Sequence, residues 1–322
     1  MFKNLLQLQR HFHNERICIE YIEKQRWHGK PECPHCDSEN HYRTATRLKS
    51  GELKGYKDFW CKACGKKYTT LTGSIYESTK VSLQVWLSAV YLVTAHKKGI
   101  SSVQLAKDLG VTQKTAWFLN HRIREMLKER MPEALKNTVE IDETFIGGAS
   151  KNRHESKKRK NHLGATLREQ KPVLGMIERQ GKLIAIVMPN RERETILPLV
   201  YKNVEQSSTI ITDEYTAYKD LKLNYEHFKI HHSSKEYVNG NLHTNTLEGF
   251  WSLLKRGIIG IYHFTSHKHL QRYVDEFSYR YNSRKLPDAE RFELAVERCG
   301  QGSIKYHTLI EKIVHLNNEK GC

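Results

Sequence analysis

Two short cysteine pairs constrain the fold of this chain more than any other feature of its sequence. Cys33 and Cys36 form the first pair, and Cys61 and Cys64 form the second. Each pair presents two thiolates from one tight turn, and two such turns complete a tetrahedral Zn²⁺ site. We predict a zinc ribbon with one structural Zn²⁺, because four thiolates leave no open position for a substrate. The alternatives are redox-active dithiols or a chance spacing.

The charge of the chain indicates a polyanionic partner. Its 322 residues contain 53 Lys and Arg against 36 Asp and Glu, a formal net charge of +17. This excess favours nucleic acid, the commonest large polyanion in cells, although a merely basic protein is the alternative. The length allows two or three domains. Because we find neither a long apolar run nor a signal peptide, we expect an intracellular protein.

Residues 100–128 predict two helices joined by a tight turn. Ser101 or Ser102 caps the first helix, and Gly110 ends it. Thr112 caps the second helix. The pattern is typical of a helix-turn-helix, whose second helix enters the major groove of DNA, but a plain helical hairpin is the alternative. The candidate DNA contacts of the second helix are Gln113, Lys114, Asn120 and Arg122.

From residue 138 onward the pattern changes from helices to strands. The runs predict three hairpin-like strands, then a strand, a helix, a fifth strand and a late helix from Asn245. This is the order of elements in an RNase H-like α/β fold. The expected strands cover residues 138–148, 171–179, 182–190, 208–213 and 227–233.

Three carboxylates occupy positions in apolar surroundings, where an unpaired charge is costly. Asp142 lies within the first strand, Asp213 ends the fourth, and Glu248 lies among apolar positions of the late helix. Carboxylates on two strands and a facing helix can converge on two Mg²⁺ or Mn²⁺ ions that serve a phosphoryl transfer. Lys255 follows Glu248 by two helical turns and shares its face. Glu143 points to the other side of its strand, so we expect it to be solvated or salt-bridged.

These motifs in combination resemble a known family. The order CPHC, CKAC, helix-turn-helix, IDETFIGG, ITDEYTAY and HTNTLEGFWSLLKRGIIGIYH is similar to the DDE transposases of bacterial insertion sequences, relatives of the Merlin elements. The resemblance implies that Asp142, Asp213 and Glu248 form the catalytic triad of a retroviral-integrase-type domain. It implies cleavage of transposon ends by water and joining of the freed 3′-hydroxyl to target DNA. It also implies that Lys255 contacts the terminal DNA, and Arg256 beside it is a further candidate.

We therefore expect a multidomain chain of five segments. These are an N-terminal helical segment (1–27), a zinc ribbon (28–75), an all-α helix-turn-helix domain (78–132), an RNase H-like catalytic domain (138–285) and a helical tail (286–322).

The expected partners are double-stranded DNA, from transposon ends and target, and further copies of the chain in a homodimer or larger synaptic assembly. We expect no membrane partner, and a location in the bacterial cytoplasm on the nucleoid. The basic run at 151–160, with Lys157, Lys158 and Arg159, either contacts phosphate or is a solvated loop. A catalytically silent DNA-binding regulator and an RNase H-like nuclease that joins no strands are the alternatives.

Overall fold

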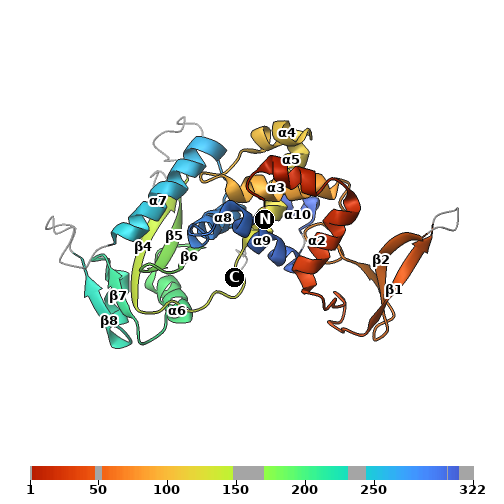
Figure 1. The fold of residues 1–322 in the computed structure, drawn as a ribbon. Helices are drawn as coiled ribbons and strands as arrows, with labels where there is room; N and C mark the ends of the chain where they lie inside the picture. Colours follow the sequence, from red (N-terminus) through yellow and green to blue (C-terminus); the bar gives the residue numbers. More distant parts are fainter. Residues whose placement is uncertain (1, 48–52, 148–169, 231–243, 303, 312–322) are drawn as a thin grey trace, which may run out of the picture. The chain divides into compact units, whose positions relative to one another are not determined.

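The computed structural model describes residues 2–47, 53–147, 170–230, 244–302 and 304–311 (Figure 1). The chain divides into two compact units: unit 1 combines Met1–Leu127 with Leu286–Cys322, and unit 2 is Lys128–Lys285. Among the described residues, no helix has the length and apolar character needed to cross a membrane.

Unit 1 is mainly helical. Its first two helices, α1 (Leu5–His11) and α2 (Glu15–Trp27), each begin at an asparagine whose side chain accepts a backbone N–H of the first turn. The apolar α3 (Leu83–Ala95) is almost wholly buried. The chain returns to this unit with α9 (Asp288–Glu297), a 3₁₀ turn and α10 (Tyr306–Ile310).

The segment expected as a C-terminal helical tail contributes to the core of unit 1. Arg291 of α9 donates a hydrogen bond from Nη1 to the carbonyl oxygen of Thr94 at the end of α3, at 3.2 Å. Phe292 is fully buried, and its ring lies 6.0 Å from that of Tyr21 and 6.1 Å from that of Tyr91. Helix α9 therefore packs between α2 and α3 as a structural element.

A small antiparallel sheet follows α2. It has the order β1-β2-β3, with β1 at His41–Arg47, β2 at Leu53–Cys61 and β3 at Lys67–Thr69. The Phe59 and Tyr68 rings stack at 5.1 Å, and the Trp27 ring meets that of Phe59 edge-on at 5.4 Å. These rings and Cys33 and Cys61 form one cluster, so the aromatic packing fixes the cysteine-bearing turns.

Two helices with a tight turn occupy residues 102–127, as predicted. Helix α4 (Ser102–Leu109) is capped by the Ser101 hydroxyl and ends at Gly110, whose φ of 65° suits glycine. Helix α5 (Gln113–Leu127) follows, and the Thr112 hydroxyl accepts the backbone N–H of Thr115 at 3.2 Å. The predicted caps and turn are confirmed.

Unit 2 is built on a five-stranded mixed sheet with the order β6-β5-β4-β7-β8. The first three in the chain, β4, β5 and β6, pair antiparallel, whereas β7 and β8 run parallel to β4. This is the predicted succession of three hairpin-like strands, a strand, a helical segment and a strand. The strands lie at Thr138–Ile146, Lys171–Glu178, Leu183–Val187, Thr209–Thr212 and Glu226–Lys229.

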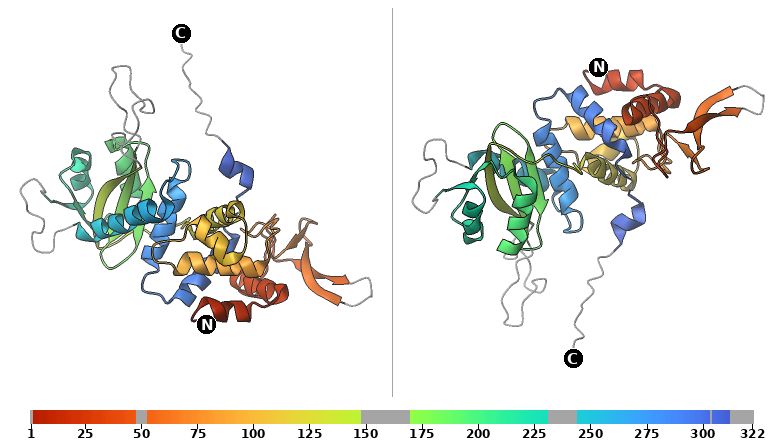
Figure 2. Two further views of the ribbon diagram at one scale, coloured as in Figure 1. Left: turned by 90° about the horizontal axis from the view of Figure 1, so that it is seen from above. Right: turned by 90° about the horizontal axis from the view of Figure 1, so that it is seen from below.

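Helices cover both faces of this sheet (Figures 1 and 2). One face packs against α6 (Arg193–Asn203) and the 3₁₀ helix η3 (Thr216–Leu223). The other packs against α7 (Asn245–Gly257) and α8 (Leu270–Asn282). Side chains alternate along β4, so Val139 and Ile141 face α6 whereas Ile146 faces α7.

Candidate active site and zinc ribbon

The four cysteines of the two pairs come together in the ribbon. Their Sγ atoms all lie within 4.8 Å of one another, with Cys33 to Cys64 at 3.7 Å and Cys36 to Cys61 at 3.6 Å. Tetrahedral Zn²⁺ with bonds of about 2.3 Å needs sulfur atoms about 3.8 Å apart, so the thiols fit a structural zinc ion. Each turn ends in a left-handed residue after its second cysteine, and one of these is Gly65 at φ 65°.

Two of the three predicted catalytic carboxylates meet at the edge where β4 and β7 separate. The two parallel strands pair only up to Glu140 and Ile211. Asp142 lies just beyond this point on β4, and Asp213 follows the last residue of β7. The carboxyl ends of parallel strands thus open a crevice with both acids on its wall. Asp213 is held in its turn by the backbone N–H of Tyr215, at 3.0 Å from Oδ1.

Glu143 joins these two acids. It faces the α6 side of β4, as expected, yet one of its oxygens lies with those of Asp142 and Asp213 in a group spanning at most 4.8 Å. Its side chain is fully buried rather than solvated, and it forms the expected salt bridge, with Arg191 Nε 3.6 Å from Oε1. Neither carboxylate oxygen has a hydrogen-bond partner among the described residues. The alternation rule did not identify Glu143 as a candidate, because it ignores the open space beyond the last strand pair.

Burial controls the electrostatics of this acidic cluster. Desolvation raises the pKa of Asp142 to about 6, and the charges of Asp213 and Glu248 add to this shift. Desolvation also raises the pKa of Glu143 to about 7, against the opposing effect of the Arg191 charge. A divalent cation among the carboxylates would relieve both effects. The donors are hard oxygen atoms, which Mg²⁺ and Mn²⁺ prefer, so the residues fit such an ion.

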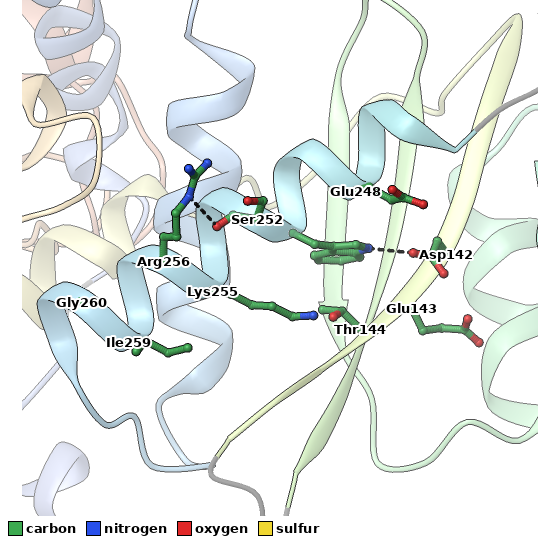
Figure 3. Close-up of a pocket in the computed structure, with 10 residues that line it drawn as sticks. Asp142, Glu143, Thr144, Glu248, Ser252, Lys255, Arg256, Ile259 and Gly260 are labelled. Carbon is green, nitrogen blue, oxygen red and sulfur yellow. Dashed lines mark hydrogen bonds between the residues drawn. The ribbon is translucent and has the colours of Figure 1, made fainter. Parts of the chain in front are cut away.

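Glu248 reaches the same site from α7 without being part of the tight cluster. It lines a pocket of about 700 Å³ together with Asp142 and Glu143. Figure 3 shows the acids at one end of this pocket and the basic part of α7 at the other, where Lys255 and Arg256 line it. The carboxylate and the ammonium two turns apart on α7 therefore open onto one cavity, as their spacing predicted.

Trp251 is a member of the site that the sequence reading treated only as an apolar helix position. Its indole Nε1 donates a hydrogen bond to Oδ2 of Asp142 at 3.0 Å. The ring lies over Gly175 of β5, which pairs with Asp142 across the strands. A Trp three residues after an acid on a helix that faces a strand is the signal that could have indicated it.

The structure changes the set of candidate DNA contacts on α5. Gln113 and Lys114 are exposed, although Gln113 donates to the Ser102 hydroxyl at 3.0 Å. Asn120 is buried and donates to the Ile100 carbonyl oxygen at 3.4 Å. Arg122 is buried and donates to the Glu77 carbonyl oxygen at 3.0 Å. Since the second half of α5 packs inside unit 1, Asn120 and Arg122 are not available to DNA in this structure.

The remaining candidate DNA contacts lie on two basic segments, of which the structure describes one. Lys255 and Arg256 are exposed on α7. Lys157, Lys158 and Arg159 lie outside the described residues.

Comparison with known protein families finds two matches along the chain. Residues 134–282 match the ISXO2-like transposase domain, and residues 13–67 match the transposase zinc-ribbon domain. The chain therefore contains an ISXO2-like transposase domain and a transposase zinc-ribbon domain. The acidic cluster and the cysteine cluster each fall within the matched part of this transposase.

Individual relatives agree with this assignment. An uncharacterised protein in transposable element ISH50 of Halobacterium salinarum is 26% identical over 295 residues, which cover 89% of this chain and 97% of the relative. An uncharacterised transposase-like protein of Haemophilus influenzae is 28% identical over 106 residues, 33% of this chain and 85% of the relative.

Two solved structures are similar at lower levels. The Mos1 strand transfer complex and a pre-cleavage Mos1 transpososome each share 15% identity, with 66% of this chain and 78% of theirs covered. Their TM-scores are 0.26 and 0.24.

Proposed function

We propose that this transposase cuts the ends of its own insertion sequence and joins the freed 3′-hydroxyls to target DNA. The observation that carries the proposal is the convergence of acids from β4, the end of β7 and α7 on one crevice beside two basic residues. The order of strands supports an RNase H-like catalytic fold for unit 2.

In this proposal Asp142, Asp213 and Glu248 hold divalent cations, with Mg²⁺ or Mn²⁺ as the ions that suit their oxygen atoms. Two such ions, when bound, polarise the scissile phosphate and lower the pKa of the attacking water or 3′-hydroxyl. Glu143 is an additional candidate ligand, because its oxygens are buried and lack hydrogen bonds among the described residues. Trp251 orients the Asp142 carboxylate through its indole N–H.

The basic residues of the pocket have a different role. Lys255 and Arg256 lie on the exposed face of α7 and line the pocket that the acids line. Their positively charged side chains would bind the phosphate next to the scissile bond, so the DNA end would lie along α7 with its terminus at the acids. This phosphate contact would fix the position of the DNA along the protein, but it would not depend on the base sequence.

Unit 1 is proposed to recognise the terminal sequence. Helices α4 and α5 have the caps and the turn of a helix-turn-helix, and the early α5 residues Gln113 and Lys114 are exposed. The net charge of +17 supports binding of double-stranded DNA. We propose that two or more copies assemble on the two transposon ends, at the nucleoid of a bacterial cell.

The test separates DNA binding from chemistry. Asp142→Asn, Asp213→Asn and Glu248→Gln each remove a proposed ligand charge while nearly preserving volume. We expect DNA affinity to persist and metal-dependent nicking and joining of a labelled end oligonucleotide to fall at least about 100-fold, a loss typical of removing one electrostatic contact at a transition state.

The matched control is Glu214→Gln, because Glu214 follows Asp213 in the chain and is exposed. It should keep most of the activity. A triad variant that nicks at the wild-type rate would refute the assignment of ligands. A wild-type protein that nicks but never joins would instead favour a nuclease, and one that binds DNA without nicking would favour a regulator.

A further inference from the structure

A third acidic residue of β4, Glu140, is buried against the start of α7, the helix that carries Glu248. Its side chain is fully buried, and Oε1 accepts hydrogen bonds from Arg179 Nε at 3.0 Å and from Thr246 Oγ1 at 2.9 Å. Its Oε2 accepts the backbone N–H groups of Thr246 at 3.1 Å and Leu247 at 3.2 Å. A buried carboxylate is costly unless it is paired in this way, so the position is specialised.

These contacts make Glu140 the cap of α7. The first N–H groups of any helix lack partners within the helix, and a side chain at the N-cap usually accepts one of them. The N-cap residue of α7 is Thr244, whose side chain makes no such bond. From the neighbouring strand β4, Glu140 accepts the N–H groups of Thr246 and Leu247, the second of which is shared with the Thr244 carbonyl oxygen at 3.1 Å. Its negative charge lies at the positive end of the helix dipole.

A second link joins the same helix to the same strand one turn further along. Trp251 of α7 donates to Asp142 of β4, and residues 140 and 142 point to the same face of the strand. The indole fits there because β5 carries Gly175 opposite Asp142; a Cβ at this position would lie 2.5 Å from the Trp251 ring. Glu248 therefore lies between two points at which α7 is bonded to β4.

We propose that Glu140 and Trp251 are positioning residues that fix α7 in register on β4, so that Glu248 is held facing Asp142. This inference rests on the proposed function, since it takes Glu248 and Asp142 as partners in metal binding. It adds that the third acid is positioned by a helix cap from the strand of the first acid. Neither residue needs to touch DNA or metal for this role.

The first test uses Glu140→Gln in the full-length protein, with Glu178→Gln as the matched control. Glu178 lies on β5 beside β4 and bonds Asn137 rather than α7. We expect Glu140→Gln to speed hydrogen exchange at least about tenfold in peptides covering residues 244–250, while residues 209–212 stay unchanged. The Mg²⁺ concentration for half-maximal nicking should rise several-fold with unchanged DNA affinity. Glu178→Gln should change neither quantity.

Unchanged exchange at residues 244–250 overturns the proposal. Faster exchange spread evenly over unit 2 also overturns it, because that result means a purely structural role for Glu140.

Trp251→Phe keeps the bulk of the ring and removes the donor to Asp142. It should also raise the Mg²⁺ requirement, and a wild-type requirement overturns the role of Trp251. If Asp142→Asn still nicks, the proposed function fails, but the exchange measurement on Glu140→Gln still tests the cap.

Discussion

Successive acidic residues of β4 have different surroundings, and this decides their chemistry. Glu140 is fully satisfied by hydrogen bonds at the start of α7. Asp142 has one indole donor and opens onto the pocket. Glu143 is buried next to Arg191 without hydrogen bonds among the described residues. The strand thus supplies one structural acid and two acids whose charge is costly in the absence of a metal ion, for Glu143 even beside Arg191.

The raised pKa values of Asp142, about 6, and Glu143, about 7, predict a pH-dependent response to metal. A carboxyl whose pKa is higher in the folded than in the unfolded state stabilises the fold at low pH, and this contribution is lost as pH rises through 6 to 7. A bound cation favours the charged form. We expect the increase in Tm on adding Mn²⁺, measured by calorimetry, to be larger at pH 8 than at pH 5.5.

The double variant Asp142→Asn with Glu143→Gln provides the control for this prediction. It should show a small Mn²⁺ effect that is the same at both pH values. An equal increase in Tm at pH 8 and pH 5.5 for the wild-type protein would contradict the prediction.

Single residues also show the limit of reading a sequence. The capping positions Ser101, Gly110 and Thr112 were predictable, because caps depend on neighbouring residues only. The burial of Asn120 and Arg122 was not, since it depends on which side of α5 packs against the rest of unit 1. A polar side chain on a helix looks the same in sequence whether it faces DNA or a backbone carbonyl.

Among the elements, α7 combines a functional face with two glycines, one packed closely against α8 and the other with open space around it. A Cβ at Gly257 would lie 2.0 Å from Cζ of the buried Phe277 on α8, whereas a Cβ at Gly249 would meet nothing within 4 Å. Glycine is therefore required at one position of the helix and only lowers helix propensity at the other.

Gly257→Ala should lower the free energy of unfolding by about 1–3 kcal/mol, the usual cost of overpacking a core. Gly249→Ala should raise it by up to about 1 kcal/mol, because alanine favours the helix. Urea unfolding of both variants with the wild-type protein gives the comparison. If both variants change stability in the same direction, the α7–α8 packing described here is wrong.

The zinc ribbon is the element that the sequence predicted best, because cysteine spacing and knuckle geometry are local. The prediction for this element concerns its metal content. Purified protein should hold one Zn²⁺ per chain by elemental analysis, and Cys33→Ser or Cys61→Ser should lose it and unfold the ribbon, since structural zinc supplies about 10–16 kcal/mol in such domains. Cys18→Ala, at a buried cysteine outside the cluster, should keep its zinc. Absence of stoichiometric zinc in the wild-type protein would refute the site.

At the scale of the whole molecule, the order of domains along the chain differs from their grouping in space. The sequence pattern predicted the strands of unit 2 and the helices of unit 1, since periodicity is local. The pattern could not show that α9, more than 180 residues after α3, completes the core of unit 1. The apolar period of an amphipathic helix shows which face is buried but does not show which element covers that face. A fragment that ends before α9 therefore lacks part of the unit that is proposed to read the terminal DNA sequence.

The contribution of α9 can be measured in the full-length protein. Phe292 is fully buried among rings from α2 and α3, so Phe292→Ala should lower the free energy of unfolding by about 3–5 kcal/mol. Ile310→Ala, at an exposed position of α10, should change it by less than about 0.5 kcal/mol.

Because α9 supports the helices next to α4 and α5, the affinity for terminal DNA near the unfolding temperature should fall with Phe292→Ala. Nicking by unit 2 at lower temperature should persist. If Phe292→Ala is as stable as Ile310→Ala, residues 286–297 are an appendage of unit 1, and a fragment without them should bind DNA ends as well as the whole chain does.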